Sequence, residues 1–243
     1  MKLDFERKSN GMYIISRVGM DKVAREFLSE YAPNALTKAE PVGIGSIAEE
    51  HLGLTLKYQN LSPNGEISGL VTFGDTEYDC YDRMFRPVKL EIADGTILID
   101  VSLSKEISYP RRRYTIAHEV SHRLLHRSYR SPSNKQFSFR GKHGALIACR
   151  AGNIERPYDD GGTKTDPEWE EWQADALAAA ILMPKDTFGP LAETMIHSRT
   201  GTRFLSQATP REIRQDIIKR IAGAFVVSHR ATEIRLKHLK LMQ

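Results

Sequence analysis

The sequence predicts an α+β fold: one helical domain with a small antiparallel sheet beside its central helix, followed by C-terminal helices. Three observations lead to this prediction. Apolar residues recur at helical spacing in the segments 113–126 and 168–183. Segments rich in β-branched residues lie between residues 67 and 101. After Pro210 the apolar residues return to helical spacing.

The composition is typical of a soluble globular protein. The chain of 243 residues is 40% hydrophobic and 27% charged, and its net charge is +4. No apolar run approaches the roughly 18 residues of a membrane span, so we expect no membrane association. The first residues lack the apolar segment of a signal peptide. Two cysteines, Cys80 and Cys149, give no disulfide framework, which favours a cytoplasmic location.

Two helices are predicted in the first quarter of the chain. Residues 21–32 place their apolar side chains on one helical face, and Asp21 is suited to cap that helix. Residues 41–53 predict a second helix, which ends at Gly53 because glycine readily adopts the left-handed conformation at a helix end. A short strand is expected directly after it.

Strands are predicted next, at residues 67–73, 88–92 and 96–101. The last two flank Asp94-Gly95, a dipeptide that is typical of tight hairpin turns. We therefore expect these two strands to form a hairpin within a small antiparallel sheet, packed beside the helix that follows.

That helix carries the sequence H-E-x-x-H as His118, Glu119 and His122. On a helix the two histidines lie one turn apart on the same face, so they can bind one zinc ion together. Glu119 stands beside them and is suited to take a proton from a water molecule at the metal. The motif is short and also arises by chance, in which case the histidines are an ordinary surface or hydrogen-bonded pair.

A third ligand is offered by the Ala-rich helix predicted at residues 168–183. A catalytic zinc site has three protein ligands and one open position, and its histidines usually donate their other ring N–H to a carboxylate. Glu171 and Asp175 are four residues apart and share a helical face, so Glu171 is the predicted third ligand and Asp175 the partner of a histidine. Glu168 and Glu170 remain alternatives, although acidic residues also favour the first turn of a helix electrostatically.

Together the two helices resemble the ImmA/IrrE family of zinc metallopeptidases. The residues that carry the resemblance are Arg113 to Glu119, His122, Leu125, His126, Glu171, Ala174, Asp175, Leu177 to Ala179 and Leu182 to Pro184. The resemblance implies a gluzincin-like site, in which His118, His122 and Glu171 bind zinc and Glu119 is the base. It also implies a role in transcriptional regulation, because members cleave, or act upon, a repressor that carries a helix-turn-helix domain.

One long interval departs from the pattern of the family. Residues 127–166 separate the two helices by more than is usual there, and we interpret this stretch as an inserted loop near the site, such as a lid or a substrate-binding element. It contains one short apolar run, 145–149. His143 and Cys149 could in principle reach the zinc and block it, although a small buried cysteine is the commoner case.

We divide the chain into a zinc metallopeptidase domain, residues 1–205, and a C-terminal helical segment, residues 206–243, which is similar to a helix-turn-helix. Its predicted helices, 211–225 and 230–241, are basic, so weak nucleic-acid contact is conceivable, but their regular apolar spacing favours docking on the first domain. Arg111–Arg113, ahead of the central helix, are interpreted as a solvated basic turn or as a contact for an acidic substrate.

The predicted function is zinc-dependent peptide hydrolysis with a protein substrate, in particular a DNA-binding repressor. Glu119 would take a proton from water and later deliver it to the leaving amine. The alternative is a non-proteolytic regulator that binds a repressor or DNA and uses zinc structurally, which a closed four-ligand site would favour. The donor that stabilises the oxyanion stays open among Tyr114, His126, His143, Tyr158 and His197.

Overall fold

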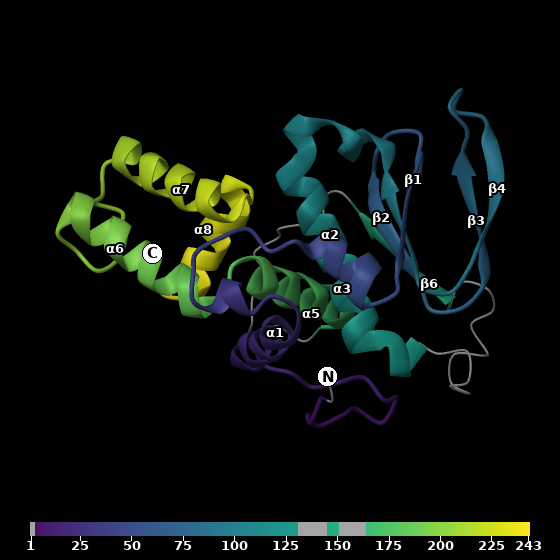
Figure 1. Cartoon of the computed structure of the whole chain (residues 1–243), viewed down its shortest axis with the longest axis horizontal. Coiled ribbons are helices and arrows are strands. Elements are labelled where there is room, and N and C mark those ends of the chain that lie inside the picture. The colour runs from purple at the N-terminus through teal and green to yellow at the C-terminus, as the bar shows by residue number, and fades with distance from the viewer. Residues whose placement is uncertain (1–2, 131–144, 151–163) are drawn as a thin grey trace.

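The computed structural model describes residues 3–130, 145–150 and 164–243. It confirms the α+β class. A group of helices occupies one end of the molecule, the strands occupy the other, and the helices α3 and α5 run between them (Figure 1). Among the described residues, no helix combines the length and the hydrophobicity that crossing a membrane requires.

The helices are α1 (Arg17–Tyr31), α2 (Ile44–Ser46), η2 (Ile47–His51), α3 (Tyr109–Arg130), α5 (Asp166–Leu182), α6 (Lys185–Thr200), α7 (Arg211–Phe225) and α8 (His229–His238). Short 3-10 turns are η1 (Pro33–Leu36), η3 (Val101–Ser104) and η4 (Glu106–Ser108). The strands are β1 (Thr55–Gln59), β2 (Ile67–Thr72), β3 (Thr76–Tyr81), β4 (Pro87–Ile92), β5 (Thr96–Asp100) and β6 (Leu146–Arg150).

The main sheet has four strands in the order β1-β5-β2-β6. Strand β2 is antiparallel to β5 and β6, whereas β1 is parallel to β5. Strands β3 and β4 form a separate antiparallel pair beside this sheet (Figure 1). The edges of the main sheet are β1 and β6. Strand β6 comes from the apolar run within the interval 127–166, and most residues of that interval lie outside the described part of the chain.

The predicted hairpin across Asp94-Gly95 is wrong. Strand β4 pairs with β3, and β5 is a central strand between β1 and β2. The dipeptide still makes a tight turn, with Gly95 at φ +74°, but the turn leads from one sheet into the other. Asp94 is held by a bidentate pair with Arg123 of α3, at 2.8 and 2.9 Å. Turn chemistry fixes the local backbone, whereas burial decides which strands pair: β5 is buried along its whole length and β4 is mostly exposed.

Helix α3 lies against β2 at a point of close approach. A Cβ atom at Gly69 of β2 would stand 2.6 Å from Thr115 Cγ2 and 3.1 Å from Glu119 Oε1. The first distance is too short for a Cβ atom and the second is tighter than an ordinary contact, so glycine lets the strand lie this close to the H-E-x-x-H turn. The other side of α3 packs on the Ala-rich helix α5 (Figure 1).

The C-terminal helices dock on the rest of the protein, as their apolar spacing predicted. Ile217, Ile221 and Phe225 of α7 are buried in the same core as residues of α1, α5 and α6. Arg235 of α8 is buried too, and it donates to the Met183 carbonyl and pairs with Asp21 at 2.6 Å. The charged guanidinium of Arg235 is therefore used for contacts inside the protein.

Asp21 does not cap α1, which begins earlier than predicted. Ser16 is the N-cap, and its Oγ accepts from the backbone N–H of Gly19 at 3.2 Å. The prediction was wrong because the residues before Asp21 continue the helix, while the carboxylate of Asp21 is used by Arg235.

Arg111–Arg113, predicted to lie ahead of the central helix, are part of α3, which begins at Tyr109. Arg113 is buried, and its guanidinium donates to the carbonyls of Phe225, Val226 and Val42 at 2.5 to 2.7 Å. It is therefore neither a solvated basic residue nor a substrate contact, because it connects α3 to the turn between α7 and α8. Arg111 is exposed.

We expect Arg113→Met to destabilise the protein by roughly 2 kcal/mol or more, because buried carbonyls lose their charged donor. Arg111→Met is the matched control and should change the free energy of unfolding by less than about 0.5 kcal/mol. Urea denaturation of both variants makes the comparison. Equal stability of the two variants would contradict the anchoring role of Arg113.

Candidate metal centre

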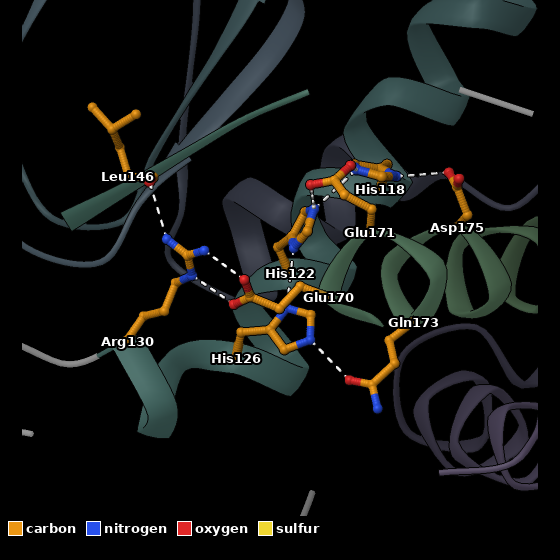
Figure 2. A network of polar contacts seen from close by, with 9 residues as sticks. All are labelled: His118, His122, His126, Arg130, Leu146, Glu170, Glu171, Gln173 and Asp175. Atoms are coloured by element: carbon orange, nitrogen blue, oxygen red, sulfur yellow. Dashed lines mark hydrogen bonds and ion pairs between the residues drawn. The ribbon is translucent and has the colours of Figure 1, made fainter. Parts of the chain in front are cut away.

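Helix α3 brings His118, Glu119 and His122 together at the centre of the molecule, and all three side chains are 0% exposed. The two histidines lie one turn apart, with their Nε2 atoms 2.9 Å from each other (Figure 2). The sequence prediction that they share one face of a helix is confirmed. Each offers its Nε2 to the same small volume.

Helix α5 supplies the third group. Glu171 reaches across to the histidines, with Oε1 3.4 Å from His122 Nε2 and Oε2 3.5 Å from His118 Nε2 (Figure 2). One ligand atom from each of the three residues lies within 4.8 Å of the others, a spacing that could hold a metal ion. The structure therefore groups the three residues predicted as ligands.

The two alternative glutamates have other roles. Glu168 closes a capping box with Thr165 at the start of α5. Glu170 forms a bidentate ion pair with Arg130 of α3, at 2.5 and 2.6 Å (Figure 2). Of the three glutamates considered, Glu171 alone faces the histidines.

Asp175 lies one turn beyond Glu171 and holds His118 from behind. Its Oδ1 is 2.9 Å from His118 Nδ1 (Figure 2). A carboxylate accepts here, so His118 Nδ1 carries the proton and Nε2 presents its lone pair to the cluster. This is the contact that the spacing of Glu171 and Asp175 predicted.

His122 has a comparable partner that the sequence did not reveal. Gln173 donates its amide N–H to the Tyr13 carbonyl at 2.7 Å, which turns its Oε1 towards His126 Nε2, 2.9 Å away. His126 Nε2 therefore carries a proton, and its Nδ1 is left to accept from His122 Nδ1–H at 3.0 Å (Figure 2). This series of hydrogen bonds leaves the lone pair of His122 Nε2 on the side of Glu171.

The charges suit a metal ion. Burial lowers the pKa of His122 and that of His126 to about 4, so both rings are neutral. Burial alone would raise the pKa of Glu171, but His122 and His118 outweigh it and hold that pKa well below its usual range. Burial alone would lower the pKa of His118 too, but Cys149 and Asp175 raise it above its ordinary value, so a metal ion at this ring would displace a proton. Two imidazoles and one carboxylate are donors that zinc prefers, so these residues fit Zn²⁺.

Glu119 is the exceptional residue of the site. Both carboxylate oxygens are buried, and within the described part of the chain neither has a hydrogen-bond partner. Burial raises the pKa of Glu119 to about 8 when protein groups alone surround it. A buried carboxyl group without partners is costly, so its retention beside the cluster favours a chemical role over a structural one.

Cys149 also lies at the site. It is 0% exposed on β6, and its Sγ, one ligand atom of His118 and one of Glu119 lie within 4.8 Å of one another. The sequence allowed this position for Cys149 but favoured an ordinary buried cysteine. His143, the other blocking residue considered, lies outside the described residues.

The residues considered as oxyanion donors divide by position. Tyr114 donates its hydroxyl to the Asp175 carbonyl at 3.2 Å, and His126 lies behind His122. His197 is exposed on α6, while His143 and Tyr158 fall outside the described residues.

Comparison with known proteins gave no match: no protein-family model fits the chain, and no curated protein matches it significantly.

Replacing Glu171 by Ala should remove most bound zinc, because two histidines leave the ion under-coordinated. Glu168→Gln is the matched control on the same helix and should retain zinc at the level of the parent. Metal content after dialysis against a weak chelator distinguishes them. Full zinc in purified Glu171→Ala protein would show that the third ligand is another residue.

His126→Leu should weaken zinc binding by about 10- to 100-fold, since it removes the acceptor that orients His122. His126→Asn should recover much of that loss, because its side-chain oxygen stands close to the position of Nδ1. Competition with a zinc chelator measures both. Equal affinity in the Leu variant and the parent would exclude the orienting role.

Proposed function

We propose that this protein is a zinc-dependent peptidase that resembles the ImmA/IrrE family and cleaves a protein partner, in particular a DNA-binding repressor with a helix-turn-helix domain. The observation that supports the proposal most strongly is the meeting of His118, His122 and Glu171 beside Glu119, whose buried oxygens lack partners. The cytoplasm is the proposed location, where the buried thiols of Cys80 and Cys149 would stay reduced.

In the proposed reaction the metal and Glu119 have different roles. Zn²⁺ in such a site supplies a Lewis acid that polarises a carbonyl group and lowers the pKa of water to about 7. Glu119 accepts the proton of the attacking water and delivers it to the nitrogen of the leaving amine. A buried carboxylate with raised proton affinity suits both halves of this transfer, because it must hold the proton between them.

Asp175 and His126 orient the two histidines that would bind the metal. Asp175 and His126 each accept a ring N–H from a ligand histidine, so both Nε2 atoms stay unprotonated. The carboxylate of Asp175 also favours the positive charge of a metal ion bound at His118 Nε2. The repressor as substrate is supported by the resemblance of helices α3 and α5 to the family.

One observation favours a second function. Cys149 forms a second possible ligand group with His118 and Glu119, and a site that took Cys149 as a fourth ligand would be closed, as structural zinc sites are. In that case the protein would be a non-proteolytic regulator that binds a repressor or DNA. The two functions differ in what Glu119 does, because a structural zinc site needs no base.

Glu119→Gln keeps the volume of the side chain and leaves the proposed ligands unchanged, so zinc content should survive. Cleavage of the partner should slow by about 10²- to 10⁴-fold, because an amide cannot accept the proton. Co-expression with the products of neighbouring genes identifies the partner, and cleavage is measured beside derepression of a reporter. Full derepression by zinc-loaded Glu119→Gln, with no cleavage by either protein, would refute hydrolysis and leave the binding function.

A further inference from the structure

The edge strand β6 is fixed against the metal centre. Cys149 of β6 stands opposite Gly69 of β2, the residue whose missing side chain allows the sheet to approach Glu119. Arg130 of α3 donates to the Leu146 carbonyl at 3.3 Å while it pairs with Glu170 of α5 (Figure 2). Strand, sheet and both ligand-bearing helices are thus joined, so the position of Cys149 follows from the fold.

Two ligand groups share one histidine. The first is His118, His122 and Glu171, and the second is His118, Glu119 and Cys149. Cys149 Sγ thus stands beside His118, a member of the first group, and beside Glu119. A movement of the sulfur towards His122 and Glu171 would let it share an ion bound to the first group. A second, independent observation marks this place: both Glu119 oxygens are fully buried and lack a partner among the described residues.

We propose that Cys149 is a fourth, displaceable ligand of the zinc and holds the peptidase in a latent form. The proposal rests on the proposed function. When Sγ binds, its S–H bond breaks and one Zn–S bond forms. The proton passes to the adjacent Glu119 carboxylate, and no oxidant or reductant is needed. With the fourth position filled by sulfur, neither water nor a scissile carbonyl can reach the metal.

The position of β6 makes the block reversible. The strand lies at the edge of the main sheet and pairs with β2, and within the described residues no strand pairs with its other side. Displacing Cys149 therefore breaks one ladder and leaves β1, β5 and β2 together. This distinguishes it from His118 and His122, which are fully buried on the central helix α3.

Cobalt tests the ligand directly, because a cysteine thiolate bound to Co²⁺ gives a charge-transfer band in the near ultraviolet. The Co²⁺-loaded parent should show that band, and Cys149→Ser and Cys149→Ala should lose it while still binding one equivalent of Co²⁺ through the remaining three ligands. Cys80→Ser is the matched control and should retain the band, since Cys80 is buried in β3 of the separate strand pair and belongs to neither ligand group.

Activity tests latency in the same variants. Zinc-loaded Cys149→Ala should cleave the partner several-fold faster than the parent, and the double variant with Glu119→Gln should be slow again. A parent without the band, or a band unchanged in both Cys149 variants, would overturn the ligand assignment even if cleavage depends on Glu119. A Cys149-dependent band in variants that cleave no faster would overturn latency. Absence of Glu119-dependent cleavage from every variant would instead refute the proposed peptidase.

Discussion

The contact between α3 and α5 is the constraint on which the site depends. Four residues of α3, spaced four apart, face α5 in a row: Tyr114, His118, His122 and His126. Each meets a different group of α5: the Asp175 carbonyl, the Asp175 carboxylate, Glu171 and Gln173. Residues one turn apart on α3 thus contact successive groups of α5. Small residues such as Ala174 and Ala178 allow the two backbones to approach. A shift of one turn between the helices would break every contact in the row.

The core around α3 and α5 contains several ionisable groups, and desolvation there opposes their charged forms. The structure compensates for most of them: Glu170 has Arg130, Asp175 has His118, and Asp21 has Arg235. Glu119 has no such compensation among the described residues. Glu119 therefore stands out against the paired charges around it, and this contrast supports its proposed role as the base.

The parts of the site that follow from local geometry were predictable. His118 and His122 share a face because any helix places residues four apart together, and the same rule relates Glu171 to Asp175. Contacts that need a partner from elsewhere were not predictable. The role of His126 depends on the amide orientation of Gln173, which the Tyr13 carbonyl sets. The position of Cys149 depends on β6 pairing with β2, and the failure of the Asp94-Gly95 hairpin has the same non-local origin.

The burial of Arg113 has a consequence for biosynthesis. The N-terminal part of α3 is secured through Arg113 by carbonyl groups of Phe225 and Val226, more than a hundred residues later in the chain. During translation α3 emerges long before these acceptors exist, so Arg113 of the nascent chain lacks its hydrogen-bond partners. Helices α3 and α5 can therefore gain their final stability only after α7 has left the ribosome. A nascent chain that stalls before that point would hold both histidines yet lack the framework that aligns them.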